Sequence, residues 1–270
     1  MENLIVLGTG TALVTRYYNT CYAIYDGENY FLTDGGGGDG IYRQFKEAGI
    51  SWNRVHHIFV SHEHTDHLLG IICAIRMITY RMSQDKYEGV LHLYAHPELL
   101  EKIRTICGLT LRAVEQKLMK ERIRWIPVAD GEQKTIMGYQ VTFFDLCSTK
   151  AKQFGYRMQL KCGKALTFLG DEPCNESREG YAENADWLLS EAFCLYSQRE
   201  IFHPYEYHHS TVKDACTLAE KRQVKNLVLW HTEDQTYGQR QEKYLEEGRG
   251  FYHGNLYIPN DLDVIRLDAL

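Results

Sequence analysis

Short apolar runs separated by turn residues dominate the first sixty positions. The runs are rich in β-branched and aromatic residues, which predicts strands at residues 4–8, 21–26, 30–34 and 55–60. A short turn containing Gly27 joins the second run to the third and indicates a hairpin. Between the third and fourth runs, Ile41, Phe45 and Ala48 recur at helical spacing, and Gly49 can end that helix.

The rest of the chain mixes helical patterns with further short strands. Residues 68–79 are apolar on nearly all sides, which predicts a buried helix. Pro97 suits the first position of a helix over 97–107, and a second helix covers about 110–121. Thr211 and Asp214 form a start typical of a capping box for a helix over 211–222. Further strands are expected at 91–96, 123–128, 133–137, 139–146, 155–162, 164–171, 187–193 and 226–231.

Two strand-rich halves with helices outside them predict an α+β fold, built as a four-layer αββα sandwich. The 270 residues are expected to form one domain over 1–270 that buries a large core. Hydrophobic residues make up 44% and charged residues 24%, as in ordinary globular proteins. These fractions exclude a disordered, collagen-like or coiled-coil chain.

The net charge and the cysteine positions indicate which kinds of partner and which cellular compartment to expect. Lys and Arg number 30 and Asp and Glu 36, so the net charge of −6 gives no basic field for non-specific nucleic-acid binding. None of the eight cysteines forms a C-x-x-C pair, which indicates reduced thiols and a cytoplasmic protein. The start has no basic region typical of a signal peptide. The longest apolar run, 68–75, is far shorter than the roughly 20 residues that span a bilayer.

The strongest chemical signal is the run Ser61-His62-Glu63-His64-Thr65-Asp66-His67, directly after a strand. His62 and His64 are two residues apart, so in an extended segment their side chains point to the same side. Asp66 and His67 follow where the chain turns into a helix. This run can therefore serve two metal ions, with imidazoles at one and a carboxylate and an imidazole at the next. These ligands suit Zn²⁺, one or two ions, with Mn²⁺ or Fe²⁺ as alternatives.

The H-x-H-x-D-H run resembles the signature of the metallo-β-lactamase superfamily. In that superfamily the remaining ligands are a third histidine, a bridging aspartate and a last histidine, each at the end of a later strand. Gly170-Asp171 after a strand matches the bridging aspartate, and Leu229-Trp230-His231 matches the last histidine. The resemblance therefore implies the metal ligands His62, His64, Asp66, His67, Asp171 and His231.

The third histidine of that pattern is missing from this sequence. No histidine occurs between Asp145 and Tyr156, where the superfamily places it. Ser148 by register and Cys147 by chemistry are the nearest replacements, since a thiolate is a good zinc ligand. A small buried core residue is the favoured interpretation of Cys147. The resemblance thus implies one complete metal site and a second that lacks a protein ligand.

Several further segments resemble the ribonuclease Z and phosphodiesterase branch of the superfamily. They are LGTGTA at the start, the Asp-Gly turn at 34–35, Gly155-Tyr156, Glu191-Ala192, and His209-Ser210-Thr211 before a helix. In that branch the H-S-T histidine lies by the scissile phosphate and an acidic residue positions it. The branch's tRNA-binding arm has no counterpart here, and the acidic Glu233-Asp234 pair follows His231, where a phosphate backbone would be repelled.

These features predict a metal-dependent hydrolase of a small phosphodiester or cyclic phosphodiester. Its partner would be a small anionic molecule, RNA is less favoured, and a homodimer is compatible with the sequence. A metal-activated water would attack, Asp66 would orient it, and His209 would act as general acid. The alternatives are a ribonuclease Z-like tRNA 3′ endonuclease, an acyl hydrolase of a lactone, thioester or β-lactam, and a degenerate metal-binding module.

Overall fold

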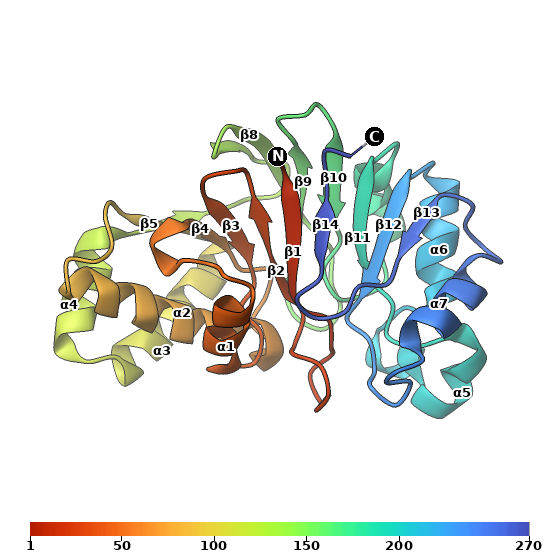
Figure 1. The fold of residues 1–270 in the computed structure, drawn as a ribbon, viewed down its shortest axis with the longest axis horizontal. Coiled ribbons are helices and arrows are strands. Elements are labelled where there is room, and N and C mark those ends of the chain that lie inside the picture. Colours follow the sequence, from red (N-terminus) through yellow and green to blue (C-terminus); the bar gives the residue numbers. More distant parts are fainter. Residues whose placement is uncertain (270) are drawn as a thin grey trace. The chain divides into compact units, whose positions relative to one another are not determined.

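The computed structural model describes residues 1–269, which form two compact units (Figure 1). The first unit contains residues 1–8, residues 18–129 and the end of the chain from Asp261 on. The second contains residues 9–17 and 130–260. Each unit has its own seven-stranded sheet and its own helices. The prediction of a single domain over 1–270 stays a prediction.

The sheet of the first unit has the order β14-β1-β2-β3-β4-β5-β6. Neighbouring strands are antiparallel from β14 to β3 and parallel from β3 to β6. The chain end supplies β14, which pairs with β1 at the opposite end of the sequence. The bounds are β1 Asn3–Gly8, β2 Cys21–Tyr25, β3 Tyr30–Thr33, β4 Val55–Phe59, β5 Leu91–Ala95, β6 Ile123–Pro127 and β14 Val264–Arg266.

Helices cover one face of this sheet, since alternate strand residues such as Leu32, Ile58 and Leu93 share a core with helix residues. Phe45 stacks on Trp52 with ring centroids 3.8 Å apart within that core. The helices are α1 Gly40–Glu47, α2 Thr65–Ser83, α3 Pro97–Thr110 and α4 Ala113–Arg122, with the 3₁₀ turn η1 Trp52–Arg54.

The sheet of the second unit has the order β13-β12-β11-β10-β9-β8-β7. It is antiparallel from β7 to β10 and parallel from β10 to β13, the same succession as in the first unit. The bounds are β7 Gln133–Ile136, β8 Tyr139–Asp145, β9 Phe154–Gln159, β10 Ala165–Phe168, β11 Trp187–Glu191, β12 Asn226–Trp230 and β13 Asn255–Tyr257.

Three helices and three 3₁₀ segments complete the second unit. Ala215, Cys216 and Ala219 of α6 pack into a core with Leu188 and Leu227 of the sheet. Thr211 and Asp214 form the expected capping box at the start of α6, each side chain bonding the other's backbone N–H. The segments are α5 Arg199–Phe202, α6 Val212–Lys221, α7 Arg240–Gly248, η2 Glu176–Ala182, η3 Tyr196–Gln198 and η4 Pro204–Tyr207.

The predicted hairpin, strands and helices are present, and the α+β class is confirmed. The largest shift concerns the buried helix, which begins at Thr65 instead of 68 and so includes half of the histidine run. Among residues 1–269, no helix has both the length and the apolarity that crossing a membrane requires.

Two glycines fasten the start of α2 to the turn that follows β3. Gly35 donates its N–H to the carbonyl of His67, and Gly70 donates to the carbonyl of Gly36, at 2.9 and 2.8 Å. A Cβ on Gly70 would lie 1.7 Å from the Gly35 carbonyl oxygen, so no larger residue fits there without movement. This close approach sets the position of Asp34 against the histidine run.

Candidate active site

The histidine run lies in the first unit, between β4 and α2. His64 is the N-cap of α2, with extended backbone, and its carbonyl accepts hydrogen bonds from the N–H groups of His67 and Leu68. The segment before His64 is extended, and Asp66 and His67 lie in the first helical turn. The local structure is therefore the one that the spacing predicts, with two histidines before the helix and two more ligands inside it.

The four potential ligands of the first unit gather into one cluster, in which His64 is partly exposed. The ring centroid of His62 lies 4.5 Å from that of His64 and 4.3 Å from that of His67. A carboxylate oxygen of Asp66 lies 3.5 Å from Nε2 of His67. His62, Asp66 and His67 are each at most 5% exposed. Three imidazoles and a carboxylate packed in this way fit a transition metal such as zinc.

Asp34, which is not among the site residues predicted from the sequence, orients this cluster. Its Oδ2 accepts hydrogen bonds from Nδ1 of His67 at 2.8 Å and from Oγ of Ser61 at 2.6 Å. Ser61 Oγ in turn lies 2.9 Å from Nδ1 of His62. Both rings thus carry their proton on Nδ1, which places the lone pair on Nε2, as in metal-binding histidines held by a carboxylate. The signal for Asp34 was its place between a strand and the four glycines 35–38.

The second unit brings Asp171 and His231 together at the ends of β10 and β12. Nε2 of His231 lies 3.5 Å from Oδ2 of Asp171, and both residues are buried. His231 adopts the left-handed backbone conformation, with φ of 55°. Gln153 donates a hydrogen bond from its side-chain amide to Oδ1 of Asp171. The two implied ligands of this unit are therefore adjacent, while a centre shared with the histidine run stays a prediction.

His209 is partly buried and pairs with the buried Glu191, the last residue of β11. Nδ1 of His209 lies 2.7 Å from Oε2 of Glu191 and 3.0 Å from the carbonyl oxygen of Asp171. The N–H of Ser210 donates to the other oxygen of Glu191 at 2.6 Å. The ring of His209 packs on Phe193, and its centroid is 5.7 Å from that of His231. These contacts fix the orientation of His209 toward the implied metal ligands.

The Glu191 carboxylate changes the acidity of His209. Burial of the ring alone would lower the pKa of His209, but the charge and the hydrogen bond of Glu191 outweigh burial and raise the pKa above its ordinary value. A histidine with a raised pKa keeps its second proton near neutral pH. The pair is therefore suited to donate a proton to a leaving group.

The segment where the superfamily places its third histidine differs from the expectation for Cys147. Cys147, expected to be buried, is exposed, because its φ of 56° turns its thiol out to accept a hydrogen bond from Nε of Arg178 at 3.2 Å. Ser148 Oγ accepts the N–H groups of Lys150 and Ala151. Within residues 1–269, Cys147 belongs to no cluster of three or more His, Cys, Asp or Glu side chains that could hold a metal ion.

The acidic pair after His231 serves the backbone of the second unit. Asp234 accepts hydrogen bonds from the N–H groups of Thr15 and Arg16, at 2.7 and 3.1 Å. Glu233 is buried and bonds the backbone and side chain of Thr236. The two carboxylates therefore hold loops in place, a role that their sequence position did not indicate.

Comparison with known proteins shows which family and which relatives this chain is similar to. The family model described as the anti-Pycsar protein Apyc1 matches residues 2–250. A ribonuclease Z of Thermococcus sibiricus is 25% identical over 99% of this chain and 97% of its own length.

Two solved structures share the fold. The metallo-β-lactamase fold protein YhfI of Bacillus subtilis has a TM-score of 0.79 at 17% identity, covering 98% of both chains. The short form of human tRNase Z has a TM-score of 0.74 at 20% identity, covering 98% of this chain and 99% of the human one. The chain therefore has the metallo-β-lactamase fold, as the H-x-H-x-D-H run predicts.

Proposed function

Because the chain belongs to the family of the anti-Pycsar protein Apyc1 and is a metal-dependent hydrolase of the metallo-β-lactamase fold, we propose that it hydrolyses a small phosphodiester or cyclic phosphodiester. The observation that carries this proposal is the pairing of partly buried His209 with buried Glu191 beside Asp171. A proton donor is needed when the leaving group is a poor one such as an alkoxide, and it is dispensable for activated acyl groups.

In the first unit, His62, His64, Asp66 and His67 would be the metal ligands, and in the second unit the implied ligands are Asp171 and His231. Zn²⁺ is the favoured ion, with one or two bound, because imidazole and carboxylate ligands suit it best. A bound ion would supply Lewis acidity to the phosphoryl oxygens and an acidified water for attack. Asp34 and Ser61 support this binding by fixing the lone pairs of His67 and His62 on Nε2.

The reaction can be followed through the protein's own groups. The oxygen of water forms a bond to phosphorus, and the bond between phosphorus and the leaving-group oxygen breaks. His209 gives the proton on Nε2 to that leaving oxygen, while its Nδ1 proton stays bonded to Glu191. The proton lost by the attacking water passes to solvent and not to His209. His209 therefore takes up a new proton from solvent before the next turnover. Asp66 accepts a hydrogen bond from the water and aligns it.

The second candidate function is tRNA 3′ processing, which the ribonuclease Z of Thermococcus sibiricus favours by its match over 99% of the chain. The net charge of −6 argues for the smaller substrate, since RNA binding draws most of its affinity from basic groups that contact phosphates.

The test is a substrate panel on protein reconstituted with Zn²⁺, Mn²⁺ or Fe²⁺. The panel contains 2′,3′- and 3′,5′-cyclic nucleotides, bis(p-nitrophenyl) phosphate, a precursor tRNA, and p-nitrophenyl acetate with a thioester and a lactone. We expect the small phosphodiesters to be cleaved and chelator to abolish turnover. Preferred cleavage of the precursor tRNA would establish the second candidate instead. Clear acyl hydrolysis without phosphodiester cleavage would overturn the proposal, as would absence of any turnover above free metal.

A further inference from the structure

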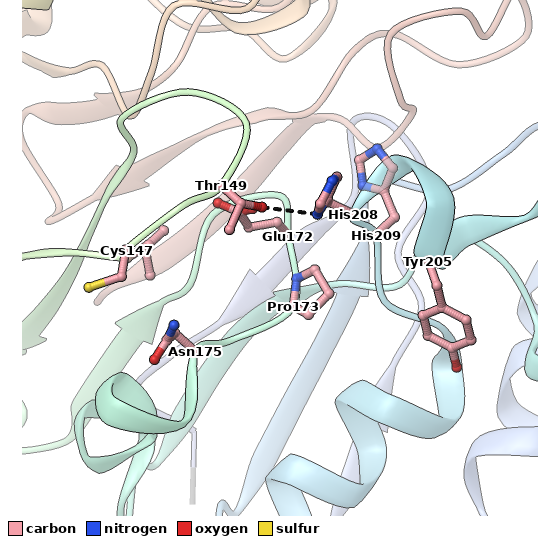
Figure 2. A pocket seen from close by; sticks show the side chains of 9 residues that line it. Cys147, Thr149, Glu172, Pro173, Asn175, Tyr205, His208 and His209 are labelled. Atoms are coloured by element: carbon pink, nitrogen blue, oxygen red, sulfur yellow. Dashed lines mark hydrogen bonds between the residues drawn. The ribbon is translucent and has the colours of Figure 1, made fainter.

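A pocket of about 180 Å³ opens beside His209 in the second unit. Figure 2 shows its side chains, with Cys147 and Asn175 at the left, Tyr205 at the right and the two histidines at the upper right. Its lining comes from three segments of the same unit, 146–149, 172–175 and 205–209. The residues are Leu146, Cys147, Thr149, Glu172, Pro173, Asn175, Tyr205, His208 and His209.

Glu172 is the one acidic residue of this lining, and it is 7% exposed. One of its carboxyl oxygens is held by the side chain of Ser148 and the N–H of Thr149. The other oxygen, Oε1, is buried and accepts no hydrogen bond from any residue in the described part of the chain. A buried carboxyl oxygen without a donor is costly, so a ligand that supplies one would be bound well.

The walls of the pocket suit a flat ring. Tyr205 donates its hydroxyl to Asp214 at 2.9 Å, which holds the phenol ring in place, and Pro173 adds an apolar ring surface. His208 is held by a hydrogen bond between its Nδ1 and Oγ1 of Thr149 at 2.9 Å (Figure 2). A cavity of about 150 Å³ takes up benzene in another protein. The volume beside His209 therefore has room for one six-membered ring.

We propose that this pocket binds the leaving group of the substrate, and that Glu172 selects leaving alcohols whose planar ring carries an N–H or O–H donor. The inference rests on the proposed function, since His209 lines the same pocket and would protonate the leaving oxygen. The alcohol oxygen lies at His209, the ring lies along Tyr205 and Pro173, and the donor lies against the Glu172 carboxylate.

The activity test uses three kinds of methyl benzyl phosphodiester, whose benzyl ring carries an amino group, an acetyl group or no substituent. The two substituted rings are tested as both meta and para isomers. Glu172 should favour the amino ring over the plain ring by about 10–100-fold in kcat/KM, the usual worth of a hydrogen bond to a charged group. In Glu172→Gln the amide oxygen takes over the bonds from Ser148 and Thr149, and the NH₂ group faces the pocket. The preference should then invert toward the acetyl ring.

Glu176→Gln is the matched control, because Glu176 is exposed, lies four residues along the chain and does not line the pocket. It should keep the preference of the unaltered protein. Comparing the ratio of two substrates between variants cancels their different intrinsic reactivities. A purely structural role for Glu172 would lower all three rates together without inverting the preference, and that result would overturn the inference.

A binding test separates this inference from the proposed function. Cys147 is an exposed thiol of the pocket, and Cys162 is an exposed thiol outside its lining. Free 3-aminobenzyl alcohol should slow alkylation of Cys147 by iodoacetamide several-fold and leave Cys162 unchanged, as read by mass spectrometry. Benzyl alcohol should protect less, and Glu172→Gln should remove the difference between the two alcohols.

The combined outcomes are decisive. Protection of Cys147 without cleavage of any phosphodiester would leave the subsite standing and overturn the proposed function. Cleavage of the phosphodiesters without a donor preference in either assay would overturn the subsite and leave the proposed function standing. Thermal melting of Glu172→Gln identifies misfolding, and Glu172→Asp, which keeps the charge but shortens the reach, should then reduce the preference without inverting it.

Discussion

Both units end their parallel strands in a carboxylate bonded to Nδ1 of a histidine, but the two pairs have different surroundings. In the first unit Asp34 holds His67 at 2.8 Å within a cluster of imidazoles. In the second unit Glu191 holds His209 at 2.7 Å at the edge of an open pocket. The sheets themselves follow the same succession of three antiparallel and three parallel pairings.

The comparison shows that the same contact serves two purposes. Beside other potential ligands, a carboxylate that fixes the Nδ1 proton presents the Nε2 lone pair to a metal. Beside a pocket for a leaving group, a carboxylate that raises the pKa keeps a proton on Nε2 for transfer. The first unit therefore contains most of the potential metal ligands, and the second contains the candidate acid. The predictions below test this division, from the largest expected effect to the smallest.

Asp66→Ala should have the largest effect on activity. The substitution removes both a metal ligand and the group that aligns the attacking water. Activity should therefore fall by more than about 100-fold, since loss of a residue that only hydrogen-bonds a metal ligand already lowers metal affinity or activity by about 10–100-fold. The loss should be equal for nitrophenyl and alkyl leaving groups. Steady-state rates with both substrates measure it. Glu63→Gln, in the same run but paired with Lys102, is the control. A loss confined to one leaving group would contradict the division.

Acid should destabilise the first unit before the second. Burial, together with the neighbouring His92 and His56, lowers the pKa of His57 to about 4. The unfolded chain therefore binds a proton between about pH 6.5 and 4 that the folded chain does not, so stability is lost as pH falls through this window. The loss amounts to about 3 kcal/mol.

Hydrogen exchange at pH 7 and 4.5, read by mass spectrometry, checks this order of opening. Amides of β4 and β5 should lose protection at the lower pH before those of β11 and β12. His57→Gln should lose less stability than the unaltered protein between the two pH values. Equal sensitivity of both units, or of both proteins, would contradict the assignment to His57.

Gly70→Ala should loosen the first unit at its metal-binding end. A Cβ there meets the Gly35 carbonyl oxygen, and such overpacking costs about 1–3 kcal/mol. Gly108→Ala in α3 is the matched control, because a Cβ at Gly108 meets nothing within 4 Å. It should stabilise by up to about 1 kcal/mol through helix propensity. Urea unfolding measures the change in the free energy of unfolding for both variants. A change of the same sign in both would refute the role of the close approach between Gly70 and Gly35.

Asp34→Asn should weaken metal binding without changing leaving-group preference. The amide cannot accept hydrogen bonds from Ser61 and His67 as the carboxylate does, and loss of such a partner costs about 10–100-fold in metal affinity. Competition with a chelator measures the affinity. Asp39→Asn, exposed in the same turn, should bind metal as the unaltered protein does. Unchanged affinity in Asp34→Asn would show that the histidines are held without it.

The sequence predicted the elements that depend on local pattern. The hairpin at Gly27, the helix opened by Pro97 and the capping box at Thr211 are all confirmed, because each depends on residues within a few positions. The pairing of β14 with β1 was not predicted, since it joins the two ends of the chain. Local pattern carries no information on such a partner.

The candidate site was predictable where the ligands are adjacent in sequence. It was not predictable where a residue distant in sequence holds a ligand by a hydrogen bond. The run from His62 to His67 forms the expected cluster, whereas Asp34 reaches it from 27 positions before Ser61. Cys147 was expected in the core and is exposed, because its left-handed backbone and Arg178 turn the thiol outward. Composition and register do not reveal a positive φ at a non-glycine residue.

The most direct test of the central claim is the dependence of rate on the leaving group in His209→Ala. An activated nitrophenyl phosphodiester needs little protonation, so its hydrolysis should hardly change. An alkyl or nucleoside phosphodiester should slow by about 10²–10⁴-fold, the usual size of general-acid catalysis. Metal content should equal that of the unaltered protein, and the exposed His253→Ala should behave as the unaltered protein does. Equal losses on both leaving groups with metal retained would contradict the account, because His209 would then bind phosphate without donating a proton.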